Sequence, residues 1–173
     1  MVRDKRLPNG NFLGLSLLKS ISAHKQVRIL IVSIGAIPQL VELLPELNPD
    51  CLELALSVLD TLSTIREGKV ALSNCSKTIP NMVRVLMRVS ENCTQHALSI
   101  LWSVCKLSPQ EYSLIAVDVG LAAKLLLVIQ SGCNPSLKQQ STELLKLCSL
   151  NYSDSIFISK YKLTTTLDDA ADF

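Results

Sequence analysis

Residues 35–44 read Gly-Ala-Ile-Pro-Gln-Leu-Val-Glu-Leu-Leu, and residues 55–62 read Ala-Leu-Ser-Val-Leu-Asp-Thr-Leu. The part of the first block that begins at Ile-Pro returns 42 residues later, at 79–86, as Ile-Pro-Asn-Met-Val-Arg-Val-Leu. The second block returns with the same offset, at 97–104, as Ala-Leu-Ser-Ile-Leu-Trp-Ser-Val. Because the same positions are apolar, small or polar in both copies, the chain contains an internal repeat.

Two weaker copies flank this pair. At 120–129 the chain reads Gly-Leu-Ala-Ala-Lys-Leu-Leu-Leu-Val-Ile, with Gly120 in the place of Gly35, and 15–22 resembles the end of a preceding unit. We therefore predict one domain over residues 1–173. It comprises a partial repeat at 12–34, repeats at about 35–76, 77–118 and 119–152, and a C-terminal tail at 153–173.

Each unit is predicted to be helical. Ile37, Leu40, Val41 and Leu44 follow the spacing of one helix face rather than the alternation of a strand. Proline suits a first helical turn, as in both Ile-Pro pairs. The stretch Ser-Pro-Gln-Glu at 108–111 has the pattern of a capping box. Since helix groups of this size cannot bury an apolar face alone, stacked units must share a core.

Composition excludes several classes of protein. The chain has 173 residues, 48% of them hydrophobic and 4% aromatic, with 17 basic and 15 acidic residues and a net charge of +2. This balance gives no case for nucleic-acid binding, which uses a clustered basic face. No apolar run approaches about 20 residues, so no membrane span is expected, and the start lacks a signal peptide. We expect a cytoplasmic protein, with the nucleus as the alternative compartment.

The inventory of reactive residues predicts no catalytic, cofactor-binding or metal-binding residue. Six cysteines include no C-x-x-C pair, and only two histidines, His24 and His96, accompany them. Zinc sites need ligands at closer spacing, so we interpret the thiols as small buried side chains and the histidines as surface or capped helix residues. Glycine-rich phosphate loops, G-x-S-x-G and H-E-x-x-H motifs do not occur. The chain alone is therefore expected not to be an enzyme.

The repeat pattern resembles that of armadillo proteins. The order Gly-x-Ile-Pro-x-Leu-Val-x-Leu-Leu, a polar gap and Ala-Leu-x-x-Leu-x-x-Leu is similar to the armadillo repeat, whereas HEAT repeats of similar length lack the Gly-x-Ile-Pro step. The resemblance implies an all-α fold, a right-handed α-solenoid of armadillo repeats. Nuclear-import receptors share the period but carry a ladder of asparagines, and Thr61, Ser103 and Lys146 occupy its positions here.

A closer resemblance, over about residues 13–167, is to the C-terminal armadillo region of plant U-box E3 ubiquitin ligases. Its most specific motifs are Ile-Leu-Trp-x-x-Cys-Lys at 100–106 and Lys-Leu-Thr-Thr-Thr at 162–166. Nothing in the chain resembles the U-box, which recruits the ubiquitin-conjugating enzyme. The resemblance implies a protein-interaction scaffold in protein ubiquitination, which binds a substrate or a regulator such as a kinase. The alternatives are a non-functional or competing fragment of such a ligase, and a transport-receptor-like peptide binder.

In armadillo folds the last helix of each unit lines a concave groove, which the resemblance places at about 52–64, 94–106 and 137–149. Trp102 is a candidate anchor because tryptophan is enriched in binding hot spots, with core packing as the alternative. Arg84 and Arg88, one turn apart on a predicted helix, are candidate contacts for an acidic partner, with a solvated helix face as the alternative. The candidate partner-binding residues are Trp102, Asp60, Glu53, Lys106, Lys146, Arg84 and Arg88. An apolar surface at the end of so short a stack would favour self-association.

Overall fold

The structure, a computed structural model, describes the backbone of residues 8–168 and the side chains of residues 10–152. This part of the chain forms ten α-helices and one short 3-10 helix, and contains no strand. The elements are α1 (Pro8–Ile21), α2 (Lys25–Ser33), α3 (Ala36–Leu43), η1 (Leu44–Glu46), α4 (Pro49–Leu62), α5 (Arg66–Asn74), α6 (Thr78–Val85), α7 (Glu91–Cys105), α8 (Pro109–Asp118), α9 (Leu121–Gln130) and α10 (Pro135–Asp168). The predicted all-α solenoid is confirmed.

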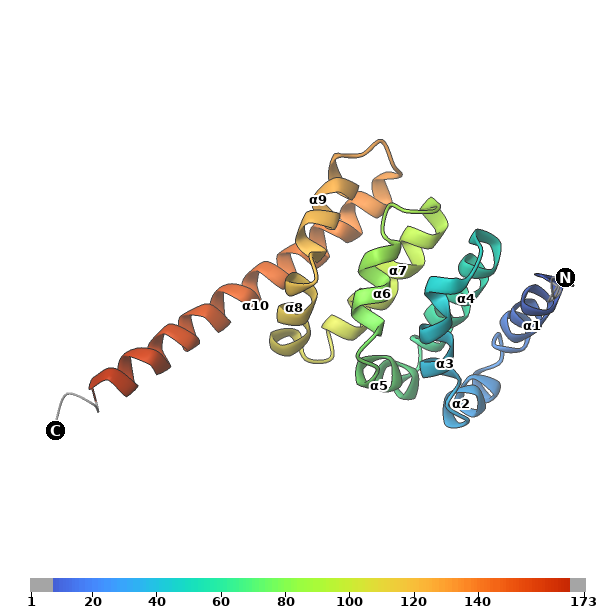
Figure 1. Cartoon of the computed structure of the whole chain (residues 1–173), viewed down its shortest axis with the longest axis horizontal. Coiled ribbons are helices and arrows are strands. Elements are labelled where there is room, and N and C mark those ends of the chain that lie inside the picture. The colour runs from blue at the N-terminus through green and yellow to red at the C-terminus, as the bar shows by residue number, and fades with distance from the viewer. Residues whose placement is uncertain (1–7, 169–173) are drawn as a thin grey trace, which may run out of the picture.

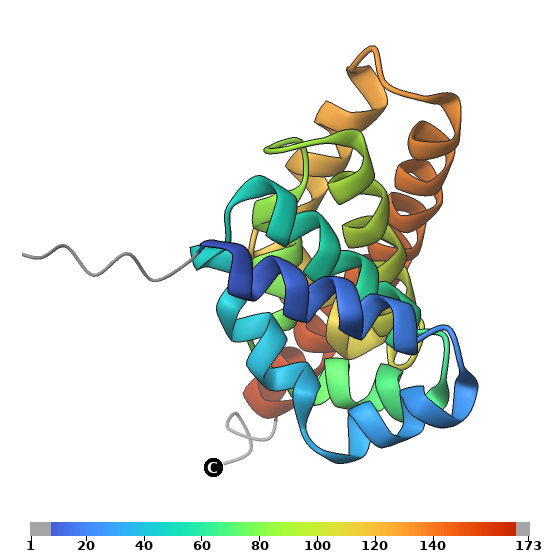
Figure 2. The same ribbon diagram turned by 90° about the vertical axis from the view of Figure 1, so that its right-hand side faces the viewer.

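The helices form triplets that lie side by side in chain order (Figure 1). The triplets are α2–α4, α5–α7 and α8–α10, and α1 lies against α4 in the position of a preceding third helix (Figure 2). They begin at Lys25, Arg66 and Pro109. The repeat boundaries taken from the sequence, at 35, 77 and 119, fall between the first and second helix of each triplet. This difference of phase arises because the strongest recurring block opens the second helix.

Glycine allows the sharp turn from the first to the second helix in two of the three triplets. Gly35 and Gly120 have φ of 76° and 89°, in the left-handed region that favours glycine. In the middle triplet Lys77 stands at the same register with φ of −84°, and Cys75 takes an extended backbone. The middle turn therefore follows a different backbone path, which needs no glycine.

Helix starts differ in whether a side chain caps them. Asn48 accepts a hydrogen bond from the Cys51 backbone N–H at 2.9 Å, and Ser90 accepts one from Cys93 at 3.1 Å. The predicted capping box at 108–111 is wrong, because the Ser108 side chain makes no capping bond. Its ψ is 83°, against 165° at Asn48 and 164° at Ser90. The uncapped start of α8 therefore differs in backbone conformation from the two capped starts.

The core is continuous from one triplet to the next and consists mainly of leucine. Leu59 and Leu62 of α4 and Leu101 of α7 are fully buried, and α4 packs against α7. Ala55 and Ala97 are also fully buried, and their small side chains allow adjacent third helices to approach closely. Stacking the triplets therefore buries apolar surface that a single triplet would leave exposed.

The last helix is longer than the rest. α10 runs through Asp168 without a break at 152, so the segment that the sequence assigned to a tail is helical up to that residue (Figure 1). The remaining tail residues, 169–173, lie outside the described part of the chain. Within that part, no helix by itself has the length and apolarity to cross a membrane. Two helix pairs satisfy such a test only jointly, and they bend by 78° and 79°.

Candidate functional site

The third helices of the triplets form a layer with polar side chains on its outer side, which we call the third-helix face. In this layer α4 packs against α7, and α7 against α10. The exposed or half-buried members of the face are Glu53, Asp60, Gln95, His96, Ser99, Trp102, Lys106, Gln139, Gln140, Glu143 and Lys146. On α7 and α10 each of these residues has another three or four positions away, and the two on α4 are seven apart, which places the side chains on one side of each helix.

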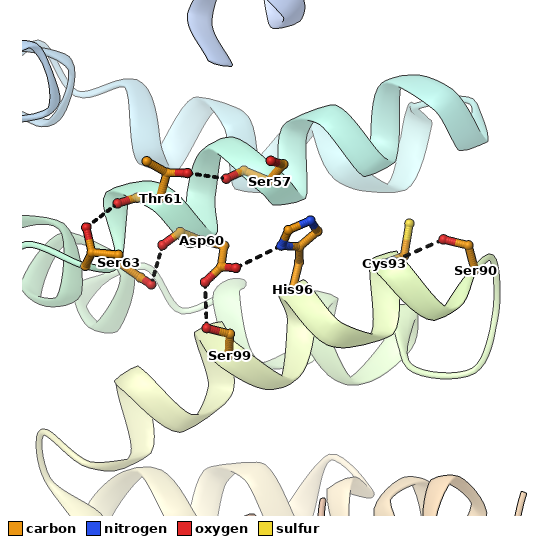
Figure 3. A network of polar contacts seen from close by, with 9 residues as sticks. Ser57, Asp60, Thr61, Ser63, Ser90, Cys93, His96 and Ser99 are labelled. Carbon is orange, nitrogen blue, oxygen red and sulfur yellow. Dashed lines mark hydrogen bonds and ion pairs between the residues drawn. The ribbon is translucent and has the colours of Figure 1, made fainter. Parts of the chain in front are cut away.

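Asp60 links α4 to α7 through its side chain (Figure 3). Its Oδ1 accepts a hydrogen bond from the Ser99 hydroxyl at 2.6 Å, and its Oδ2 lies 2.8 Å from Nδ1 of His96. The backbone carbonyl of Asp60 accepts a further hydrogen bond from the Ser63 hydroxyl at 2.7 Å. Both carboxylate oxygens thus have partners on the neighbouring triplet. Asp60 holds two third helices in register.

Glu53, near the start of α4, forms a second link between the first and second triplets. Its carboxylate accepts hydrogen bonds from the Ser90 hydroxyl at 3.1 Å and from the Asn92 amide at 3.0 Å. Burial raises the pKa of the adjacent Cys93 thiol, and the negative charge of Glu53 adds to this rise, while hydrogen bonds from Ser90 oppose it. The Cys93 thiol is therefore neutral near neutral pH. Glu53, like Asp60, is satisfied within the chain.

Trp102 lies on α7 with one side against the core and the other on the third-helix face. It is half-buried and packs against buried core residues. The ammonium of Lys106, one turn later, lies 4.9 Å from the centre of the indole ring, a distance at which a cation is attracted to an aromatic face. Trp102 and Lys106 therefore form one contiguous contact unit.

A pocket of about 270 Å³ opens beside Trp102, between α7 and α10. Its lining residues are Leu98, Ser99, Trp102, Gln140 and Glu143. The side-chain oxygen of Gln140 is buried and has no hydrogen-bond partner among the described residues, whereas the exposed Glu143 accepts a hydrogen bond from Gln139 at 3.2 Å. A buried acceptor without a partner is costly unless a donor is supplied. The pocket thus combines an aromatic wall with polar side chains from both helices.

The other sequence candidates fall in two places. Lys146 is exposed on α10, one turn beyond Glu143, and belongs to the third-helix face. Arg84 and Arg88 lie elsewhere, and the prediction that they share a helix is wrong. α6 ends at Val85, and Arg88 lies in the turn that follows, because Met87 adopts a left-handed φ of 64°. Both arginines nevertheless line one pocket, described below.

Sequence reasoning missed two residues of this surface. Gln140 stands in its unit where Ala55 stands in the first, and the buried side-chain oxygen without a partner belongs to this glutamine. His96 was interpreted as an ordinary surface residue, yet it contacts Asp60. No sequence signal identifies this contact, because the residue one repeat from Asp60 is Trp102, whereas His96 lies 36 residues from Asp60.

Chemical groups for catalysis or metal binding do not gather in the part of the chain that the structure describes. There, no group of three or more His, Cys, Asp or Glu side chains could hold a metal ion. Cys105 of α7 and Cys148 of α10 are buried side by side, and the hydrogen bond between them, together with burial, raises the pKa of Cys105.

Comparison with known proteins gives a consistent family assignment. Residues 1–168 match the profile of the plant U-box protein ARM repeat region. The chain is 69% identical over 167 residues to U-box domain-containing protein 30 of Arabidopsis thaliana, and 64% identical over 167 residues to U-box domain-containing protein 31 of the same plant. It is 61% identical over 168 residues to U-box domain-containing protein 75 of Oryza sativa subsp. japonica. Each match covers 96% of this chain but only 37% or 38% of the relative.

Proposed function

The chain belongs to the family of plant U-box protein ARM repeat regions, and from that premise we propose that it is a protein-interaction scaffold in protein ubiquitination. Its task is to hold a substrate or a regulator by the third-helix face. The observation that supports this best is the pocket beside Trp102, where an aromatic side chain and the polar side chains of Ser99, Gln140 and Glu143 line one opening between α7 and α10.

The roles within the face are divided. Asp60 and Glu53 are positioning residues in this proposal, because their carboxylates already have partners on the next triplet. Trp102 with Lys106 provides the anchor, since tryptophan beside a pocket is typical of binding hot spots. Lys146 extends the contact along α10.

Capture of partners tests this proposal. Immobilised chain, a Trp102→Ala variant and a Glu143→Ala variant are exposed to plant extract, and bound proteins are compared by quantitative mass spectrometry. We expect proteins held by the unsubstituted chain to be depleted on both variants. Gln110→Ala, an exposed change on α8 outside the third-helix face, is the matched control and is expected to retain them. Full retention by the Trp102→Ala and Glu143→Ala variants would contradict use of this pocket.

The chain alone is proposed to transfer no ubiquitin, and to act in the cytoplasm, with the nucleus as the alternative. Its relatives are named for a U-box domain, and it spans less than two fifths of their length. Incubation with ubiquitin-activating and ubiquitin-conjugating enzymes is expected to yield no conjugates above a reaction without the chain. Conjugates that depend on the chain would overturn this part of the proposal.

A further inference from the structure

A second pocket, of about 200 Å³, lies at the edge of the solenoid where the first two triplets meet. It belongs neither to the third-helix face nor to the pocket beside Trp102. Its walls come from η1 and the turn after it, from the start of α4, and from α6 with its following turn. The lining residues are Leu44, Pro45, Leu47, Pro49, Leu52, Asn81, Arg84, Val85, Arg88 and Val89.

The floor of this edge pocket is apolar and held in place. Leu44, Leu52 and Val85 are buried. The amide of Asn81, also buried, donates a hydrogen bond to the backbone carbonyl of Val41 at 2.8 Å, which joins α6 to α3. Because this bond links the two triplets whose residues form the walls, the pocket is a fixed feature of how they stack.

The rim of the edge pocket carries positive charge. Arg84 and Arg88 are both exposed, and neither forms an ion pair with any described residue. All the other lining residues are uncharged. The nearby acidic residues of the first triplet, Glu46 and Asp50, are not among the lining residues. Guanidinium groups bind carboxylates in a paired geometry, so the rim favours an acidic ligand.

The size of the edge pocket further limits the class of ligand that can bind. Small-molecule sites usually measure about 300–1,000 Å³, and this pocket is smaller. It has room for one side chain of a larger partner. Leucine and proline walls suit an aliphatic side chain, which must arrive on a segment that brings carboxylates to the two arginines.

We propose that the edge pocket docks an acidic segment of a partner protein, with one aliphatic side chain in the pocket and flanking carboxylates on Arg84 and Arg88. This contact goes beyond the proposed function, because it uses a different surface and needs neither Trp102 nor Gln140. A scaffold with two separate docking surfaces holds one partner more firmly, or two partners at once.

Fluorescence anisotropy tests the proposal with a labelled peptide, Gly-Asp-Asp-Leu-Asp-Asp-Gly, added to the full chain. We expect saturable binding that weakens with salt. Replacing the central leucine of the peptide by serine should weaken binding, and replacing the four aspartates by lysine should abolish it. The double variant Arg84→Glu, Arg88→Glu should weaken binding by about tenfold or more, from the loss of two charge pairs.

Matched variants distinguish the loss of local contacts from the effect of the change in net charge on binding. Arg66→Glu with Lys69→Glu changes the net charge by the same amount, on α5 and away from the edge pocket. We expect this control to reduce affinity by less than about threefold, through long-range effects alone. Val89→Asp, which places a carboxylate on an exposed wall position, should weaken binding by about fivefold or more. Trp102→Ala should leave binding unchanged, so this proposal and the proposed function can fail independently.

Three outcomes would overturn the proposal. The first is equal loss of affinity in the Arg84/Arg88 variant and in the α5 control, which would indicate a nonspecific charge effect. The second is full retention of binding by Val89→Asp, or by the peptide with serine for leucine, which would exclude use of the pocket. The third is a self-associated chain that dissociates when Arg84 and Arg88 are reversed in analytical ultracentrifugation, which would assign the surface to a second copy.

Discussion

Gly68 and Gly35 differ in the space that surrounds each of them for an added methyl group. A Cβ atom on Gly68 would overlap the backbone carbonyl oxygen of Leu62 and lie 2.7 Å from its carbonyl carbon, whereas one on Gly35 would meet nothing within 4 Å. We expect Gly68→Ala to lower the free energy of unfolding by about 3 kcal/mol, as overpacking does. Gly35→Ala should lower it by about 1 kcal/mol, through its left-handed φ. Urea denaturation followed by circular dichroism measures both, and equal losses would contradict the close approach at Gly68.

Asp60 supplies the second prediction for a single residue. Asp60→Ala removes the acceptor for Ser99 and the partner of His96, both half-buried. Leaving such groups without partners should lower the free energy of unfolding by about 1–2 kcal/mol. A double-mutant cycle with His96→Ala isolates the pair, and we expect a coupling energy of about 0.5 kcal/mol or more. Strict additivity would show that the contact in Figure 3 contributes nothing to stability.

Two helix starts make a matched pair at the level of elements. Asn48 caps α4 with a side-chain hydrogen bond, whereas Ser108 precedes α8 without one. We expect Asn48→Ala to lower the free energy of unfolding by about 1 kcal/mol, and Ser108→Ala to change it by less than about 0.5 kcal/mol. Chemical denaturation of the two variants decides the matter. A larger loss of unfolding free energy for Ser108→Ala than for Asn48→Ala would support the capping box that the sequence at 108–111 predicts.

The end of α6 shows why some element boundaries could not be predicted. The apolar spacing continues past Val85, so the sequence favours a helix that includes Arg88. The helix ends at Val85 because Met87 takes a left-handed φ of 64°, and its backbone N–H donates to the Thr94 hydroxyl at 3.3 Å. The turn contains no glycine or asparagine, the residues that usually indicate a left-handed backbone. A contact with the start of α7, and not a local signal, stabilises it.

The way the triplets stack predicts which cysteine thiols of the whole molecule are protected from chemical labelling. Cys75 and Cys133 are partly exposed, whereas Cys51, Cys93, Cys105 and Cys148 are buried. Only the thiolate reacts, and burial raises the pKa of Cys93. Buried thiols should therefore react only when the solenoid opens. We expect rapid labelling of Cys75 and Cys133 by a maleimide at neutral pH, and slowest labelling at Cys93 and Cys105 in the middle triplet. Peptide mass spectrometry reads out each site, and uniform rates would contradict the structure.

The first helix carries a whole-molecule prediction about association. Phe12, Leu13, Leu17 and Ile21 of α1 are exposed, Leu13 by 66% and Leu17 by 64%. An exposed apolar stripe favours contact between copies of the chain. We expect analytical ultracentrifugation to show self-association that rises with concentration, and that Leu13→Lys with Leu17→Lys abolishes. A chain that stays monomeric at high concentration would contradict this expectation, which the sequence had already suggested.

The sequence by itself determined the repeat and its helices. The recurring Gly35 and Gly120, the Ile-Pro blocks and the paired Ala55 and Ala97 are local patterns, and local patterns specify helices and their turns. Only the tertiary structure decided which polar groups meet. Asp60 contacts His96 and Ser99, and Arg84 and Arg88 share a pocket, because the triplets stack with one particular offset. That offset depends on side chains packing between layers, which the period of the repeat does not encode.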